Sequence, residues 1–118
     1  MKKIYFLSSC STCSRIMNSL NLDSSFEQQD IKIEPLNEVQ LEELHQLSGS
    51  YEALFNKRAQ LYKERQLKNR ELHETDYKVL LLEHYTFLKR PVFVIGEQIF
   101  IGNSKATIEA LEKRLNEQ

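Results

Sequence analysis

The sequence predicts an α/β fold with a mixed sheet, built in the order β-α-β, a helical middle and β-β-α. Three observations indicate it: an apolar run near the start leads directly into a helical pattern, the middle carries helical spacing, and two apolar runs near the end are separated by two turn residues. With 118 residues, 41% of them hydrophobic, the chain is the size of one ordinary domain. We therefore expect a single domain covering residues 1–118.

The first part of the chain predicts a strand, a helix and a second strand. The run Lys3–Leu7 is almost continuously apolar and ends at two serines, which is typical of a central strand buried on both faces. A helix follows the turn, with Ser11 or Thr12 available to cap it. Its apolar residues recur at helical spacing: Cys13, Ile16, Met17 and Leu20. A second strand is expected at Phe26–Ile31, near a sheet edge because its polar residues leave little to bury.

The middle of the chain is predicted to be helical. Asn37 and Gln40 have the spacing of a capping box, so a helix should start there and end near residues 48–49. Thr75 is the predicted cap of a further helix. The apolar stripe of that helix consists of Tyr77, Leu80, Leu81, His84 and Tyr85. Because His84 belongs to this stripe, we interpret it as a packed or capping histidine rather than a general base.

The last part predicts a hairpin and a helix. Pro91 opens the apolar run 92–95, which suits a proline at the first residue of a strand. Gly96 and Glu97 separate this run from the run 98–101, and glycine in first place is typical of a two-residue hairpin turn. Ser104 should cap the final helix. The buried face of that helix would consist of Ile108, Leu111 and Leu115.

Composition and charge exclude several classes of partner. The charged residues, 28% of the chain, balance to a net charge of −1, so no global field favours nucleic acid or an anionic membrane. The basic stretch 57–70 has Tyr62 as its one aromatic residue, so we expect no direct nucleic-acid binding. The apolar start stops at Ser8, which is too short for a signal peptide, and no run approaches a membrane span. We therefore expect a cytoplasmic protein, in a compartment where thiols are kept reduced.

Cys10 and Cys13 carry the clearest chemical signal. Cys10 is predicted at the N-terminal end of a helix, where unpaired N–H groups stabilise a thiolate and should lower its pKa. Cys13 lies one helical turn further on and can attack a mixed disulfide or a sulfenic acid formed on Cys10. The N–H groups of Ser11, Thr12 and Cys13 are also placed to hold an oxyanion. This pattern predicts a nucleophile with a resolving partner.

Two other interpretations of the cysteine pair remain open. A zinc site would need two more ligands, and the histidines are isolated in the sequence: His45, His73 and His84. We therefore expect no metal. The second interpretation is structural, because free cysteines are often interior and Cys13 continues the apolar stripe of its helix. A strand, a Cys-x-x-Cys run and a helix at the start of a chain favour the redox pair over this interpretation.

Four segments in a fixed order make the chain resemble the arsenate reductase (ArsC)/Spx family. They are residues 9–15 after the first strand, Gly49 with 54–58 in the helical middle, 89–92 before the hairpin, and 101–103 after it. The resemblance covers nearly the whole chain. It implies a thioredoxin-like fold with a helical insertion between the second and third strands, and a cis Arg90-Pro91 bond beside the active-site cysteine.

The resemblance also implies roles for individual residues. In arsenate reductases of this family the cysteine matched by Cys10 attacks arsenate, and three arginines surround the oxyanion. Arg90 matches one of them. Asn56 occupies the place of the first, with Arg58 two residues on as a candidate anion ligand, and Gly102 occupies the place of the third. Because asparagine and glycine lack the bidentate grip of arginine, we expect weaker oxyanion binding than in those enzymes.

The resemblance supports two functional hypotheses. The first, which we favour, is a thiol-dependent reductase of the arsenate reductase type without a bound cofactor, re-reduced by glutathione with glutaredoxin or by thioredoxin. The second is a regulator similar to Spx, in which the cysteine pair is a redox switch. There the surface that includes the position matched by Gly49 binds the C-terminal domain of the RNA polymerase α-subunit.

Overall fold

The computed structural model describes residues 1–117, and the chain forms two compact units. The first unit comprises Met1–Ile31 and Arg90–Gln118, and the second comprises Lys32–Lys89. Within the described residues, every helix is too short or too polar to cross a lipid bilayer.

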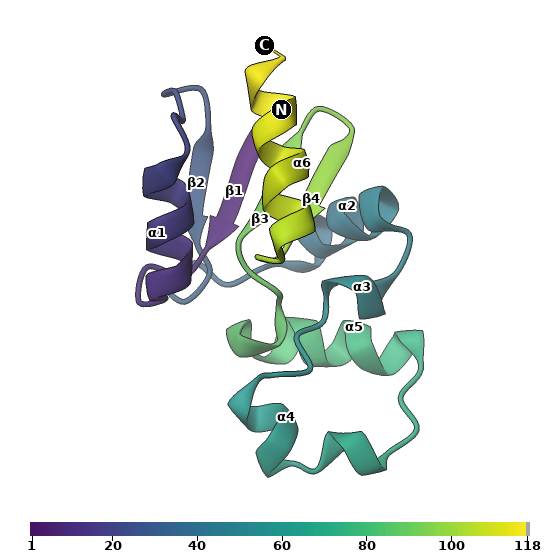
Figure 1. Ribbon diagram of the computed structural model, residues 1–118. Helices are drawn as coiled ribbons and strands as arrows, with labels where there is room; N and C mark the ends of the chain where they lie inside the picture. Colours follow the sequence, from purple (N-terminus) through teal and green to yellow (C-terminus); the bar gives the residue numbers. More distant parts are fainter. Residues whose placement is uncertain (118) are drawn as a thin grey trace. The chain divides into compact units, whose positions relative to one another are not determined.

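The first unit contains a four-stranded sheet in the order β2-β1-β3-β4 (Figure 1). Its strands are β1 (Lys2–Phe6), β2 (Glu27–Asp30), β3 (Val92–Ile95) and β4 (Gln98–Ile101). Strand β1 pairs in parallel with β2 and antiparallel with β3, and β3 pairs antiparallel with β4. The mixed α/β class is therefore confirmed, as are the inner position of the first strand and the edge position of the second.

The turn between β3 and β4 matches the predicted hairpin. Ile95 lies opposite Gln98, which leaves Gly96 and Glu97 as the two turn residues. Gly96 has φ +60°, a backbone conformation that glycine adopts without the steric cost of a Cβ atom. The choice of glycine therefore fixes the turn that brings the two strands together.

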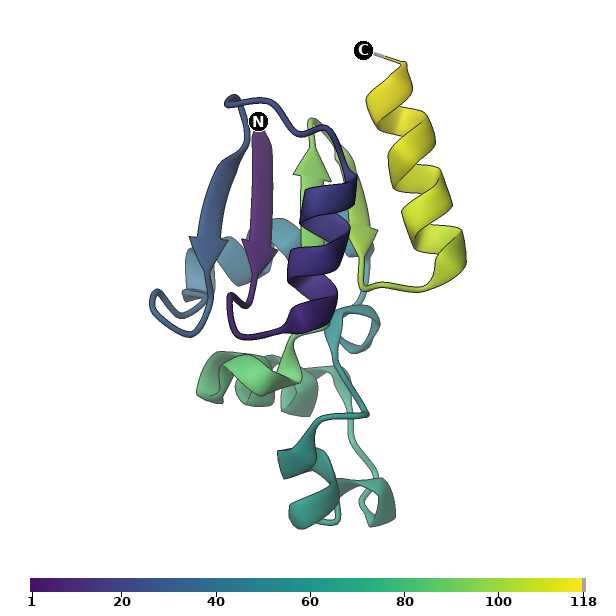
Figure 2. The same ribbon diagram turned by 60° about the vertical axis from the view of Figure 1, so that its left-hand side comes forward.

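Two helices, α1 (Ser11–Ser19) and α6 (Lys105–Asn116), cover one face of this sheet (Figure 2). The buried side chains between them form one cluster, made of Ile4, Ile16, Leu20, Phe26, Phe93, Ile95 and Leu111. Phe26 and Phe93 meet edge to face in it, with ring centroids 6.2 Å apart. The Ser104 hydroxyl accepts the N–H of Thr107 at 3.2 Å, so the predicted cap of α6 is confirmed.

The start of α1 differs from the prediction. Its N-cap is Cys10, whereas Ser11 and Thr12 already belong to the first turn, so the expected serine or threonine cap is wrong. The reason lies in the preceding turn, where the N–H of Cys10 donates to the carbonyl of Leu7 at 3.0 Å. This bond folds the chain back directly after β1 and starts the helix one residue early.

The second unit is helical. Its α-helices are α2 (Glu38–Ser48), α3 (Tyr51–Leu54), α4 (Gln60–Glu64) and α5 (Glu74–Glu83), and its 3₁₀ turns are η1 (Leu67–Asn69) and η2 (Tyr85–Phe87). The capping box of Asn37 and Gln40 is present at the start of α2. Helix α2 ends at Gly49, which has φ +78°, so both predicted ends of this helix are confirmed.

Helix α5 is shorter than predicted, and its cap is not Thr75. The N-cap is His73, whose N–H donates to the carboxylate of Asp76 at 2.8 Å. At the other end, the ring Nδ1 of His84 accepts the N–H of Thr86 at 3.2 Å and begins η2. This local bond competes with the helix, so His84 and Tyr85 fall outside the helical stripe. The capping role expected for His84 is confirmed.

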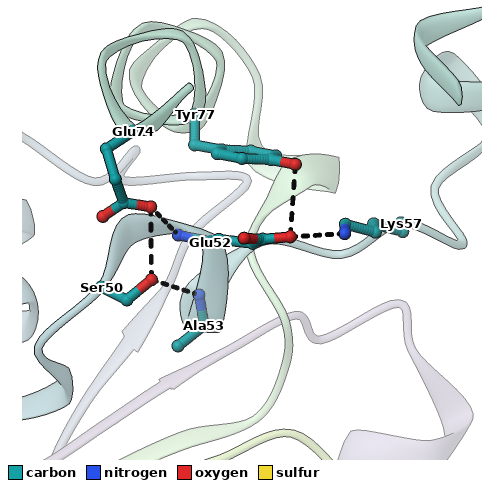
Figure 3. A network of polar contacts seen from close by, with 6 residues as sticks. All are labelled: Ser50, Glu52, Ala53, Lys57, Glu74 and Tyr77. Carbon is teal, nitrogen blue, oxygen red and sulfur yellow. Dashed lines mark hydrogen bonds and ion pairs between the residues drawn. The ribbon is translucent and has the colours of Figure 1, made fainter. Parts of the chain in front are cut away.

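A single carboxylate organises the start of α3 (Figure 3). Glu74, in the first turn of α5, accepts the N–H groups of Tyr51 at 2.7 Å and of Glu52 at 3.0 Å, and the hydroxyl of Ser50 at 3.2 Å. Glu52 in turn pairs with Lys57 at 2.6 Å. A four-residue helix has little stability of its own, so these bonds from α5 hold it in place.

Candidate active site

The site begins where β1 passes into α1. Cys10 is the N-cap residue of this helix, and its carbonyl accepts the N–H of Ser14 at 3.1 Å. Its side chain is half-buried, so a reagent in solution can reach the sulfur. The purely structural interpretation of the pair, as two buried cysteines, therefore does not fit Cys10.

The surroundings of Cys10 lower the pKa of its thiol. Burial raises this pKa, but the N–H of Cys13, the thiol of Cys13, the N–H of Thr12 and the charge of Arg90 together outweigh burial. The neutral thiol makes no capping hydrogen bond of normal length, so these groups act mainly on the thiolate. Negative charge on the sulfur is thus stabilised by the start of a helix, as the sequence predicts.

Cys13 has the opposite character. Its side chain is 0% exposed, and burial raises the pKa of its thiol to about 11. The negative charge of Cys10 and the contact with its side chain also contribute to this rise, while the N–H of Leu7 and the charge of Arg90 act against it. The surroundings therefore lower the pKa of one thiol of the pair and raise the pKa of the other.

Arg90 brings positive charge to this pair from the start of β3. Its charge lowers the pKa of both cysteines. The Nε atom of Arg90 has no contact with solvent, which indicates that the inner part of the side chain is packed. The Arg90–Pro91 bond is cis, as the family resemblance implied.

The candidate anion ligands next to Cys10 differ in what they contribute. Thr12 is half-buried, and its main-chain N–H lowers the pKa of Cys10. Ser11 is the first residue of α1 and is exposed. Both belong to the first helical turn, where main-chain N–H groups have no partner within the helix. The anion-binding role of this turn stays a prediction.

Arg58 and Gly49 belong to the second unit. Arg58 is exposed, and its main-chain N–H donates to the side-chain oxygen of Asn56 at 3.0 Å. Gly49 is exposed at the end of α2, and a Cβ atom there would meet nothing within 4 Å. Their predicted roles, anion binding for Arg58 and partner binding for Gly49, stay predictions.

One residue next to the site belongs to the segment 101–103 of the family resemblance, but no role was predicted for it. Asn103 follows β4, and its side-chain amide donates to the carbonyl of Arg90 at 3.2 Å. The register of the hairpin carries the signal for it, since residues 90 and 103 are opposite each other when the pairing of Val92 with Ile101 is continued by two residues.

The described part of the chain, residues 1–117, contains no group of three or more His, Cys, Asp or Glu side chains placed to hold a metal ion. The chemistry that the site offers is that of its two thiols.

Comparison with known proteins identifies what the chain is similar to. A model of the ArsC family matches residues 5–111. No protein with a curated description matches the sequence significantly. A structure from Bacteroides fragilis, described as ArsC family related, has a TM-score of 0.77 at 23% identity and covers 93% of this chain and 96% of its own.

Two further structures are similar over almost their whole length. A possible arsenate reductase from Streptococcus mutans has a TM-score of 0.70 at 27% identity and covers 95% of this chain and 98% of its own. An arsenate reductase from Vibrio cholerae has a TM-score of 0.69 at 25% identity and covers 94% of this chain and 95% of its own. The mixed sheet and its helices are thus those of a thioredoxin-like fold.

Proposed function

Since the chain belongs to the ArsC family, we propose that it is an arsenate-reductase-like thiol/disulfide oxidoreductase in which Cys10 is the nucleophile and Cys13 the resolving thiol. The observation that carries this proposal is the opposite state of two neighbouring sulfurs. Cys10 is half-buried with a lowered pKa, whereas Cys13 is fully buried with a pKa of about 11. In such a pair Cys10 reacts with the substrate first, and Cys13 attacks Cys10 afterwards.

In the first step the Cys10 thiolate attacks an oxidised sulfur atom of the substrate or the central atom of an oxyanion. A new bond forms to the Cys10 sulfur, and the leaving group departs with the electron pair of the bond that breaks. The thiolate is stabilised by the main-chain N–H groups of Thr12 and Cys13 and by the charge of Arg90. The same groups are suited to hold a negatively charged substrate.

The first step makes the second easier. Burial raises the pKa of Cys13, and the charge of Cys10 and the hydrogen bond between the sulfurs add to that effect. Once Cys10 is bonded to the substrate, its sulfur carries no charge and the last two causes disappear. The N–H of Leu7 and the charge of Arg90 still lower the pKa of Cys13. Cys13 then loses its proton more readily and attacks Cys10.

The second step closes the cycle on the protein. Cys13 forms a disulfide with Cys10, and the reduced substrate leaves with the electron pair of the bond it loses. The protein has then given up two electrons and two protons in all. A cellular thiol system, either glutathione with glutaredoxin or thioredoxin, returns them and needs no bound cofactor.

Arsenate is the narrower proposal for the substrate. Arg90 supplies one cation near the sulfurs, while Asn56 and Gly102 stand where the resemblance places two more arginines. Each lost arginine removes a charge-assisted bidentate contact with an oxyanion. We therefore expect arsenate to bind weakly, and disulfides or sulfenic acids to react more readily.

Intact-mass analysis after mild peroxide treatment tests the proposal. The native protein should lose two hydrogen atoms, whereas Cys10→Ser and Cys13→Ser should not. Retention of both hydrogens in the native protein, or their loss from either variant, would contradict the redox pair. A parallel sample with arsenate in place of peroxide tests the narrower substrate, since only a true arsenate reductase would then form the disulfide.

A second candidate is a redox-sensing regulator of the Spx type that binds the C-terminal domain of the RNA polymerase α-subunit. It is favoured by the open surface at Gly49, where an added Cβ atom would meet nothing within 4 Å. Purified α-subunit domain should then bind the reduced and the oxidised protein with different affinity. Absence of binding in both redox states would reject this candidate and leave the oxidoreductase unaffected.

A further inference from the structure

The pairing of β3 with β4 continues past the strand ends towards the active site. Val92 pairs with Ile101 in the last regular position. In the next position the N–H of Gly102 donates to the carbonyl of Pro91 at 2.9 Å. One position further, Asn103 lies opposite Arg90, and its side-chain amide donates to the carbonyl of Arg90 at 3.2 Å. A side chain thus replaces the main chain as donor at the end of the ladder.

The hydrogen bond from Asn103 holds the main chain of the residue that carries the positive charge, Arg90. Pro91 has no N–H and cannot contribute a donor to the ladder, so the link between the two chains here depends on the loop after β4. The bonds from Gly102 and Asn103 fasten two consecutive carbonyls of the segment that carries Arg90. Because the Arg90 side chain starts from this main chain, the position of the main chain determines where the guanidinium group can lie.

We infer that Asn103 is a positioning residue, which holds the main chain of Arg90 so that its guanidinium stays beside the Cys10 sulfur. The inference rests on the proposed function, since it concerns the cation that this site offers to an anionic substrate. The charge of Arg90 already reaches both sulfurs. Loss of the Asn103 bond removes the hydrogen bond at the Arg90 carbonyl and lets the cation shift relative to the nucleophile.

Because Asn103 is exposed, its effect on Arg90 can be measured in a protein that stays folded. An exposed hydrogen bond competes with water and contributes little to folding, so its loss should leave the protein folded. Asn103→Leu has a similar volume and no donor. Ser104→Ala is the matched control, because it removes the cap of α6 from the same loop and leaves the Arg90 contact intact.

The experiment compares two alkylating reagents at one pH. Iodoacetate is an anion and iodoacetamide is neutral, so the ratio of their rates at Cys10 measures nearby positive charge independently of the thiolate fraction. Asn103→Leu should lower this ratio about threefold, in the range expected for one displaced charge near a protein surface. Ser104→Ala should leave it unchanged. In an Arg90→Met background, Asn103→Leu should have no further effect.

Two results would overturn the inference. One is an unchanged ratio in Asn103→Leu, and the other is an equal fall of the ratio in the Arg90→Met background, because Asn103 would then act without Arg90. The alkylation rate of the native protein against pH, measured with iodoacetamide alone, tests the proposed function separately. An ordinary thiol pKa at Cys10 would reject that function, whatever the ratios show.

Discussion

The contact of Cys10 with the side chain of Cys13, which is 0% exposed, lowers the pKa of the Cys10 thiol. The same contact has opposite effects on its two partners, because it stabilises the thiolate of Cys10 and helps to raise the pKa of Cys13 above its ordinary value. One residue can therefore be reactive only while the other keeps its proton. The three-residue separation of Cys10 and Cys13 produces this coupling through one turn of helix.

The first prediction concerns the reactivity of Cys10. Burial raises the pKa of its thiol, but the N–H and thiol of Cys13, the N–H of Thr12 and Arg90 bring it below the ordinary value of 9.0. Alkylation by iodoacetamide, followed by mass spectrometry, should thus reach half of its maximal rate below that pH. Cys13→Ala should move the midpoint upward, because it removes the thiol that helps to lower the pKa of Cys10.

The control for this prediction is Cys10→Ser, which should abolish the fast phase of labelling altogether. A midpoint that stays the same in Cys13→Ala would show that the contact between the sulfurs has no influence on the nucleophile.

The second prediction concerns alkaline stability. The pKa of Cys13 is about 11 in the folded protein against 9.0 for an ordinary thiol, so the unfolded chain loses this proton first as the pH rises. The stabilising effect is complete below pH 9 and is lost on the way to pH 11. The free energy of unfolding, measured with urea, should fall by on the order of 2 kcal/mol across this interval through Cys13 alone.

Cys13→Ala supplies the comparison, since it has no proton to lose. Only the slope of stability against pH matters, because the cavity left by the missing sulfur lowers stability equally at each pH. Equal slopes in the two proteins would contradict the raised pKa.

Much of the first unit could be predicted because its signals are local. The Gly96–Glu97 turn depends on one positive φ, and the Ser104 cap depends on a hydroxyl three residues before its partner Thr107. The Cys-x-x-Cys pair could likewise be predicted from its spacing. The start of α1 could not, because serine and threonine are better caps than cysteine by propensity. The bond between the Cys10 N–H and the Leu7 carbonyl overrode that preference.

The parts that could not be predicted depend on residues far apart in the sequence. Helix α3 has four residues, too few for a periodic pattern, and its first two N–H groups bond to Glu74 in α5. Asn103 reaches Arg90 only through the register of the β3–β4 hairpin.

The limits of α5 were missed for a local reason, since the side chains of Asp76 and His84 bond to the main chain and set both ends.

The third prediction concerns Glu74, whose carboxylate accepts the N–H groups of Tyr51 and Glu52 at the start of α3. Glu74→Gln keeps the shape of the side chain but removes the charge that strengthens its bonds to the N–H groups of Tyr51 and Glu52. Because Glu74 is exposed, the loss should be modest, about 1 kcal/mol in urea unfolding at neutral pH. Glu71→Gln removes a charge from the segment just before α5 without touching α3. Equal losses in the two variants would mean that net charge, and not the bonds to α3, matters.

The fourth prediction compares two phenylalanines that face each other across β3 and β4. Phe93 is 1% exposed and packs edge to face on Phe26, whereas its partner Phe100 is only partly buried against the same cluster. Phe93→Ala should cost about 3–5 kcal/mol in urea unfolding, because it leaves a cavity that the sheet cannot close. Phe100→Ala should cost clearly less, since water can reach part of the space. Similar losses at both positions would contradict a core centred on the α1 and α6 face of the sheet.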